Sequence, residues 1–182
     1  MTGLFFGSFN PPHIGHVNTL ITALKSPLID SIEVIPAIHN PWKEFSVDWD
    51  IRIDMIKETF NIPKITVNEI EKKLVKSNIV YTYEVLQLFD SNENIIITTP
   101  ETYNQISDWY NGDLILEEFK FLIIASKHFD CGNLPKDTNI IFSRDIEICS
   151  TDIRNMIKKG LNPSPFITPS VESIIHSKNL YK

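Results

Sequence analysis

His13 and His16 stand three residues apart in the sequence and could act together on one anion. They open a stretch with helical spacing, and residues three apart on a helix are neighbours on its surface. The free N–H groups and the positive dipole end at a helix N-terminus already favour phosphate. The pair therefore predicts a phosphate-binding site, although such a pair, taken alone, is more often structural.

A strand and a tight turn are expected just before this pair. Leu4–Phe6 is a short apolar run, which is typical of a buried strand. Gly7 and Ser8 allow close backbone approach in a turn. The two prolines that follow, Pro11 and Pro12, suit the start of a helix. Apolar residues then recur at helical spacing and predict one core-facing stripe, formed by Ile14, Val17, Ile21 and Leu24.

Two other kinds of site are disfavoured by the sequence. Cys131 and Cys149 are far apart and form no Cys-x-x-Cys unit, so a zinc site is not expected. Gly3 and Gly7 do not complete the Gly-x-Gly-x-x-Gly run of a dinucleotide-binding turn. We therefore expect no metal ion held by protein side chains alone.

A second group of polar residues precedes a predicted helix near the C-terminus. Ser150 is expected to be the N-cap of this helix, with Thr151 following it. Arg154 lies about one turn further on, and its planar guanidinium can pair with two phosphate oxygens. Alone, this is most simply a capped helix with an incidental arginine. Together with the histidines, it predicts the second half of a triphosphate clamp.

Strand-like and helix-like segments alternate along the chain, which predicts a parallel sheet covered by helices on both faces. Strands are expected at Leu4–Phe6, Ile32–Ile35, Ile65–Val67, Ile95–Thr98, Phe121–Ala125 and Ile140–Phe142. Helices are expected at His13–Leu24, Asp50–Phe60, Thr82–Phe89, Ser107–Tyr110, Thr151–Lys159 and Ser170–Ser177. Lys127–Thr138 is expected to be a surface loop. No repeat or linker divides the 182 residues, so a single domain over residues 1–182 is predicted.

The composition narrows the class of protein further. Hydrophobic residues at 42% and charged residues at 22% are ordinary for a globular chain. The net charge of -6 argues against a general nucleic-acid binder. No apolar run approaches the roughly 20 residues of a membrane span. The absence of a signal peptide and of a cysteine framework predicts a cytoplasmic protein. A homo-oligomer remains an open option.

Both polar groups resemble motifs of one superfamily. Gly7-Ser8-Phe9-Asn10-Pro11 followed by His-x-Gly-His resembles the signature of nucleotidyltransferases that share a Rossmann-like fold with class I aminoacyl-tRNA synthetases. The segment Ile148–Arg154 resembles the Ile-Ser-Ser-Thr-x-x-Arg motif of nicotinate and nicotinamide mononucleotide adenylyltransferases, with Cys149 in place of the first serine. The resemblance implies an α/β, Rossmann-like, doubly wound parallel sheet. It also implies transfer of AMP from ATP to a pyridine mononucleotide, with Mg²⁺ carried by the nucleotide phosphates.

The resemblance extends along most of the chain and assigns expected roles. It covers the loop Pro36–Lys43, Arg52, the Tyr81-Thr82 and Trp109-Tyr110 pairs and the tail from Val171 to Tyr181. The implied catalytic residues are His13, His16 and Arg154. The implied ATP-binding residues are Gly7, Ser8, Phe9, His16, Ser150, Thr151, Arg154 and Glu101, the last standing where the family usually carries Gly-x-Asp. The implied acceptor-binding residues are Asn10, Lys43, Tyr81, Thr82 and Trp109, with Trp109 stacking on the pyridine ring.

Several other functions fit the sequence less well. A pantetheine-phosphate adenylyltransferase usually carries threonine at the first histidine position, and Arg154 and Trp109 argue against it. A cytidylyltransferase or a tRNA synthetase would be expected to show different second motifs. A catalytically inactive nucleotide-sensing protein is disfavoured because both histidines and Arg154 are present. The sequence leaves the choice between nicotinate and nicotinamide mononucleotide open.

Overall fold

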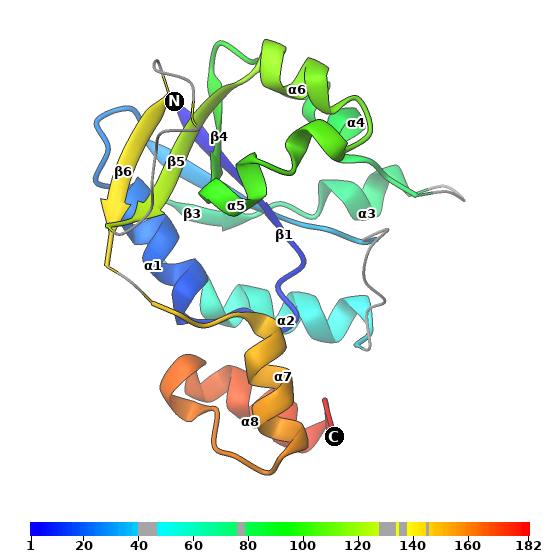
Figure 1. Cartoon of the computed structure of the whole chain (residues 1–182). Coiled ribbons are helices and arrows are strands. Elements are labelled where there is room, and N and C mark those ends of the chain that lie inside the picture. Colours follow the sequence, from blue (N-terminus) through cyan, green and yellow to red (C-terminus); the bar gives the residue numbers. More distant parts are fainter. Residues whose placement is uncertain (40–46, 76–78, 128–133, 135–137, 145) are drawn as a thin grey trace.

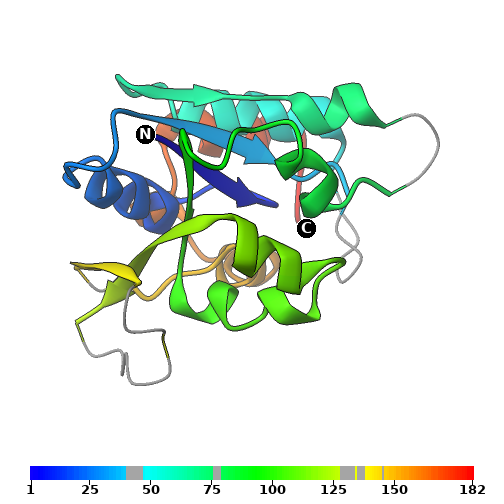
Figure 2. The same cartoon turned by 90° about the horizontal axis from the view of Figure 1, so that it is seen from above.

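Six parallel strands form one sheet at the centre of the computed structural model, in the order β3-β2-β1-β4-β5-β6. The structure describes residues 1–39, 47–75, 79–127, 134, 138–144 and 146–182. The strands are β1 (Thr2–Gly7), β2 (Ser31–Pro36), β3 (Ile65–Val67), β4 (Asn94–Thr98), β5 (Lys120–Ser126) and β6 (Asn139–Ser143). All six expected strands are present. In Figure 2 the arrows of β1 (dark blue) and β2 (lighter blue) lie side by side, as their parallel pairing requires.

The strand order changes direction between β1 and β4, which are direct neighbours in the sheet. The chain builds β1 to β3 outward on one side of this point and β4 to β6 outward on the other. This is the doubly wound, Rossmann-like arrangement, in which ligands bind beyond the carboxyl ends of the strands at the switch point. The predicted fold class is confirmed.

Helices connect the strands, as the alternating sequence pattern predicted. The α-helices are α1 (Ile14–Ala23), α2 (Trp49–Thr59), α3 (Ile70–Leu74), α4 (Thr82–Leu86), α5 (Pro100–Tyr103), α6 (Gly112–Glu118), α7 (Ser150–Lys158) and α8 (Pro169–Ser177). Two short 3₁₀ helices lie at Ile106–Asp108 (η1) and Ser164–Phe166 (η3). Within the described ranges, none of these helices has the length and apolar character needed to cross a membrane.

The short helix expected at Ser107–Tyr110 is only partly present. The 3₁₀ helix η1 covers Ile106–Asp108 and ends before Trp109, and α6 begins only after Asn111, whose backbone is left-handed with φ 52°. A Cβ atom on Gly112 would lie 1.8 Å from the carbonyl oxygen of Ile106, so only glycine lets these two elements approach so closely. The sequence pattern does not predict helices α3, α5 and α6, because a helix of four to seven residues is too short to show a clear helical period.

Three apolar clusters hold the layers together. One joins α1 and α2 to one face of the sheet and includes Phe5, Leu20, Ile53, Phe60 and Ile97. A second joins α4 and α6 to the opposite face and includes Leu4, Leu86, Ile115 and Ile123. A third packs α7 and α8 against α2 and includes Met55, Ile153, Val171 and Tyr181. Figure 1 shows the result, with α7 and α8 beyond α1 and α2 on the side away from α4–α6.

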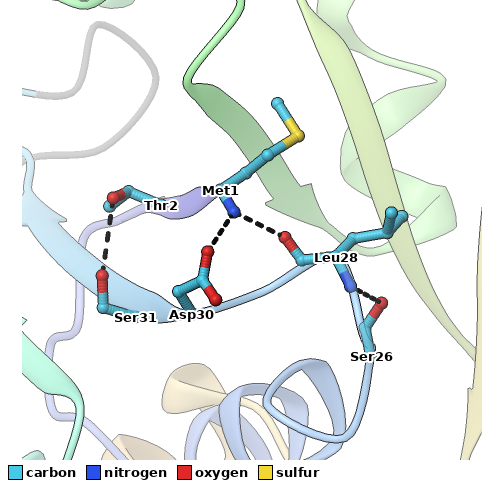
Figure 3. A network of polar contacts seen from close by, with 6 residues as sticks. All are labelled: Met1, Thr2, Ser26, Leu28, Asp30 and Ser31. Atoms are coloured by element: carbon cyan, nitrogen blue, oxygen red, sulfur yellow. Dashed lines mark hydrogen bonds and ion pairs between the residues drawn. The ribbon is translucent and has the colours of Figure 1, made fainter.

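Polar contacts fix the amino end of β1, opposite the switch-point crevice. The amino group of Met1 donates to the carbonyl of Leu28 at 2.9 Å and pairs with the Asp30 carboxylate at 2.6 Å. The hydroxyls of Thr2 and Ser31 lie 3.4 Å apart at the start of the β1–β2 pairing (Figure 3). The central strand is therefore anchored at the end that faces away from the site described next.

Candidate active site

The residues of the two predicted phosphate-binding motifs come together at the carboxyl end of β1, beside the switch point. Strand β1 ends at Gly7, and residues Ser8–His13, which we call the β1–α1 loop, lead into α1. His13 is the N-cap of α1 and His16 lies in its first turn. The centroids of the two imidazole rings lie 3.7 Å apart, so the rings face one another closely. The structure thus brings together the two histidines that the sequence singled out.

In each histidine, one ring nitrogen accepts a hydrogen bond from a backbone N–H group at the start of α1. His13 Nδ1 accepts a hydrogen bond from the Gly15 N–H at 3.1 Å, and His16 Nδ1 accepts one from the His13 N–H at 3.2 Å. In a neutral imidazole the nitrogen that accepts carries no proton, so the proton resides on the other nitrogen. We therefore assign the proton of both rings to Nε2. The pair offers two Nε2–H donors to a phosphate.

Both histidines are held neutral. Burial lowers the pKa of His13 to about 4, with the nearby Asp152 carboxylate opposing the change. Burial and the neighbouring His13 lower the pKa of His16 well below its usual value. Two stacked imidazoles cannot both be charged without strong repulsion. Before a nucleotide arrives, the histidine pair therefore presents neutral hydrogen-bond donors rather than cations.

Two glycines make room for the rings of this loop. A Cβ atom on Gly15 would lie 2.9 Å from Cε1 and Nδ1 of His13, inside contact distance. A Cβ atom on Gly7 would lie 2.6 Å from Cζ of Phe9. The Phe9 side chain is 1% exposed and packs in the core, with φ 46° at its backbone. Only the backbone of Phe9 can therefore contact ATP, because its ring is buried and packs edge-to-face against the His16 ring, with centroids 5.0 Å apart.

Four polar contacts from distant parts of the chain hold the β1–α1 loop. The carbonyl of Ser8 accepts from Arg52 Nη1 at 2.8 Å, and the carbonyl of Asn10 accepts from Arg154 Nη1 at 2.7 Å. The Asn10 side-chain Oδ1 accepts from the Tyr181 hydroxyl at 2.6 Å. The carbonyl of Pro11 accepts from the Ser150 hydroxyl at 2.8 Å. The two predicted motifs are therefore in direct contact, although 139 residues separate Ser150 from Pro11.

The prediction that Ser150 caps α7 is wrong. Cys149 occupies the N-cap position, and its N–H donates to Asp152 Oδ2 at 2.9 Å. An acidic residue three positions after the cap is the spacing of a capping box, and Asp152 stands at that spacing from Cys149. Ser150 is the first residue of the helix, which leaves its hydroxyl free to reach Pro11. Arg154 extends back along the helix, with Nη2 3.1 Å from the Thr151 hydroxyl.

Three of the expected acceptor residues, Tyr81, Thr82 and Trp109, lie at the start of α4 and in the turn after η1, while Asn10 lies in the β1–α1 loop. Tyr81 precedes α4, Thr82 is its first residue, and the Tyr81 ring stacks on Tyr110 with centroids 4.4 Å apart. Trp109 is half-buried against the apolar cluster of α4 and α6. Glu101 is exposed in the first turn of α5, directly after β4. Lys43 and most of the predicted loop Lys127–Thr138 lie outside the described residues.

Two buried groups near the loop had no assigned role at the level of sequence. Glu71 on α3 is buried and accepts the Ile38 N–H at 2.8 Å, directly after β2. Burial raises the pKa of Glu71 to about 7, against the effect of its hydrogen bond from Ile38 and of the nearby Arg52. Tyr181 follows α8 and reaches the β1–α1 loop through Asn10. The family resemblance includes Tyr181 in the C-terminal tail but gives it no role, and no sequence pattern marks Glu71, because the partners of both residues are far away along the chain.

Within the described ranges, no group of three or more histidine, cysteine, aspartate or glutamate side chains could hold a metal ion. The groups that the structure brings to the loop are neutral imidazoles, a guanidinium, hydroxyls and backbone N–H groups. Donors of this kind stabilise negative charge on phosphate oxygens without supplying a nucleophile. This donor set suits a reaction in which two phosphate-bearing substrates are aligned.

The fold and the site define a nucleotidyltransferase, and a comparison with protein families agrees. Residues 4–156 match the model of the family described as cytidylyltransferase-like, and the chain belongs to that family. The matched range includes the histidine pair, the loop that carries it and the α7 residues that hold the loop.

Full-length relatives narrow this class. A Clostridium perfringens protein named "probable nicotinate-nucleotide adenylyltransferase" is 32% identical, over 99% of this chain and 97% of its own length. A Flavobacterium johnsoniae protein of the same name is 31% identical, over 99% and 98%. Within the cytidylyltransferase-like class, the chain is thus a member of the nicotinate-nucleotide adenylyltransferases, as the resemblance predicted.

Solved structures share the fold. The Plasmodium falciparum nicotinic acid mononucleotide adenylyltransferase in complex with NaAD has a TM-score of 0.81 and 21% identity, covering 99% of this chain and 96% of its own. The same protein in complex with APC, an ATP analogue, has a TM-score of 0.78. At 21% identity the likeness establishes the fold alone, so the role of the site is argued from the geometry of this chain.

Proposed function

We propose that this protein transfers AMP from ATP to nicotinate mononucleotide, releasing pyrophosphate. The observation that carries the proposal is the contact between the two motifs at the carboxyl end of β1. The facing imidazoles of His13 and His16 lie at the end of the β1–α1 loop, and the guanidinium of Arg154 bonds to Asn10 in that loop. The names of the full-length relatives support nicotinate rather than nicotinamide as the acceptor.

In the proposed reaction, a 5′-phosphate oxygen of the mononucleotide attacks the α-phosphorus of ATP and pyrophosphate leaves. A phosphate oxygen is already ionised at neutral pH, so neither a protein nucleophile nor a general base is needed. Catalysis then depends on alignment of the two substrates and on stabilisation of charge in the transition state. The neutral donors of this site fit that requirement.

We assign the roles of the phosphate residues as follows. The Nε2–H of His16 would donate to the α-phosphate, and that of His13 to the same or the next phosphate. The backbone of Gly7, Ser8 and Phe9 would border the triphosphate. Thr151 and Arg154 would hold the leaving phosphates with their side chains, and Ser150 with its backbone N–H, because its hydroxyl proton is donated to Pro11. Arg154 already donates to Asn10 and Thr151, and a guanidinium has five N–H donors, so donors remain for phosphate.

The acceptor would lie on the other side of the α-phosphate. We assign its binding to Asn10, Lys43, Tyr81, Thr82 and Trp109, with Trp109 stacking on the pyridine ring. Glu101, at the carboxyl end of β4, would meet a ribose hydroxyl of ATP. The Asn10 Oδ1 is already occupied by Tyr181, so its amide nitrogen is the group left for a ligand.

Mg²⁺ would arrive as part of the MgATP substrate. Mg²⁺ prefers oxygen ligands and keeps several waters, so ATP phosphate oxygens and water would complete its coordination. The ion would neutralise part of the triphosphate charge while it remains bound to the nucleotide.

The test is product formation by the purified chain. With MgATP and nicotinate mononucleotide, we expect the dinucleotide and pyrophosphate in equal amounts, measured by chromatography and a coupled pyrophosphate assay. Folded protein that binds ATP and yields neither product would contradict the proposal and favour a nucleotide-sensing protein.

A further inference from the structure

Tyr181 makes a buried hydrogen bond to the loop that carries the histidines. Its hydroxyl donates to Asn10 Oδ1 at 2.6 Å, and the two side chains are 7% and 6% exposed. The contact joins residues 171 positions apart in the sequence. The tail after α8 thus reaches the candidate active site.

The hydroxyl of Tyr181 lies among the groups that hold the loop. Burial raises the pKa of Tyr181, while the guanidinium groups of Arg154 and Arg52 act in the opposite direction. Both arginines are therefore near the phenol. Arg154 donates to the Asn10 carbonyl and Arg52 to the Ser8 carbonyl. The Tyr181 hydroxyl thus bonds to the side chain of Asn10, while the two nearby guanidinium groups hold the backbone on either side of Phe9.

The backbone around Tyr181 is in an unfavourable conformation. Tyr181 has φ 63° and Asn179 has φ 55°, and both lie in the left-handed region. This region is uncommon for a bulky side chain and is kept only where the surroundings demand it. The turn after α8 directs the Tyr181 side chain into the protein, where its hydroxyl meets Asn10.

A role in packing alone does not explain the hydroxyl. The Tyr181 ring belongs to the apolar cluster with Val171 and Ile175, where a phenylalanine ring would fill the same space. Burial of a hydroxyl is unfavourable unless it is hydrogen-bonded. The bond to Asn10 provides that partner, and Asn10 is the residue whose carbonyl Arg154 holds.

We infer that Tyr181 is a positioning residue for AMP transfer, whose hydroxyl fixes Asn10 so that Arg154 and the histidine pair keep their spacing. The inference deepens the proposed function and rests on it. Without the hydroxyl, the Asn10 side chain loses its donor and the β1–α1 loop gains freedom. The phosphates of ATP would then meet a less well-ordered set of donors.

The first test is Tyr181→Phe, which removes one oxygen and keeps the ring. We expect kcat/KM for ATP to fall about five- to thirtyfold, the effect of one unsatisfied buried acceptor. The matched control is Tyr83→Phe on α4, since the Tyr83 hydroxyl donates to Glu118 at 3.3 Å on the exposed surface. The control should leave kcat/KM unchanged.

The second test asks whether Tyr181 acts through Asn10. In an Asn10→Ala background, Tyr181→Phe should change kcat/KM by less than about twofold, because the shared bond is already lost. Equal losses in both backgrounds would mean that the hydroxyl acts elsewhere, and this would overturn the inference.

The third measurement needs no turnover. We expect the ¹⁵N and ¹H imidazole resonances of His13 and His16 in the unliganded protein to shift in Tyr181→Phe and to stay in place in Tyr83→Phe. Unshifted histidine resonances together with unchanged kcat/KM would overturn the inference. If the wild-type chain formed no dinucleotide, the proposed function would fail. The spectrum would still show whether the Tyr181 hydroxyl fixes the conformation of the β1–α1 loop.

Discussion

In the paired histidines, hydrogen bonds from the backbone fix the side chains in the orientation needed to donate to a phosphate. Each ring gives its Nδ1 to an N–H group at the start of α1, and this fixes both the ring orientation and the position of the remaining proton. Binding of a triphosphate would favour the charged form of such a ring, so donation can strengthen as charge develops in the transition state. The same contacts also cap the helix.

His16→Ala should lower kcat far more than it weakens ATP binding. Its donor acts on charge that grows in the transition state, and loss of one such donor costs about 10²–10³-fold in kcat. Steady-state kinetics would measure kcat, and calorimetry would measure the Kd for ATP. The exposed His176 on α8 provides the control variant, His176→Ala, which should behave as wild type. Unchanged kcat with a raised KM would reassign His16 to binding alone.

The low pKa of His13 also predicts how stability responds to acid. The pKa of His13 is about 4 in the folded protein and 6.5 ordinarily, so only the unfolded chain takes up the proton between these values. The free energy of unfolding that His13 contributes is thus complete above pH 6.5 and is lost as the pH falls towards 4.

In His13→Gln, the free energy of unfolding should depend less on pH, by about 1.4 kcal/mol per pH unit between pH 6 and 4.5. Urea denaturation at several pH values would measure the slope. The comparison with wild type isolates His13 from Glu71, whose raised pKa gives the opposite slope between pH 4.5 and 7. Identical slopes in the two proteins would show that His13 titrates normally.

The helix α7 and the β1–α1 loop form one unit, although they come from opposite ends of the chain. The Ser150 hydroxyl and the Arg154 guanidinium hold successive carbonyls, those of Pro11 and Asn10. The position of α7 relative to α1 therefore depends on the same contacts that order the phosphate donors.

Cys149→Ser should stabilise the protein relative to Cys149→Ala by about 1 kcal/mol, because serine is a far better N-cap than alanine. Both variants keep the Cys149 N–H bond to Asp152, so the side chain alone is compared. Urea denaturation at neutral pH gives the difference. Equal stability of the two variants would mean that the side chain at this position does not cap α7.

Long elements and local motifs could be predicted from the sequence, whereas contacts between distant segments could not. The buried strands have apolar runs, and the histidine spacing indicates a shared helical surface. The short helix α5 has too few residues for a period. The residue type of Ser150 favours it as the cap, but the spacing of Asp152 points to Cys149, which is the N-cap in the structure. The bonds of Tyr181 and Glu71 depend on the folded chain and leave no local pattern.

On the scale of the whole molecule, the residues proposed for phosphate binding and for pyridine stacking come from the two halves of the sheet. The histidine pair follows β1, while Trp109 lies after η1 in the connection from β4 to β5. An indole face suits a pyridine ring, and such stacking contributes on the order of 1 kcal/mol beyond burial. The half-buried position of Trp109 leaves part of its ring for a ligand.

Trp109→Ala should raise the KM for the mononucleotide about five- to tenfold while the KM for ATP changes little. Trp109→Phe should be milder, because it keeps a stacking face. Since Trp109 also packs on the α4 and α6 cluster, thermal unfolding of each variant must accompany the kinetics. If ATP and acceptor binding suffer equally, or the fold collapses, Trp109 is a core residue and the acceptor lies elsewhere.

The central claim is that the chain adenylylates nicotinate mononucleotide. Parallel kinetics at saturating MgATP, with nicotinate and nicotinamide mononucleotides as alternative acceptors, test it most directly. We predict that kcat/KM for the nicotinate form is higher by about tenfold or more, a difference of about 1.4 kcal/mol in transition-state stabilisation. Equal values, a preference for nicotinamide mononucleotide, or no dinucleotide from either acceptor would contradict the claim.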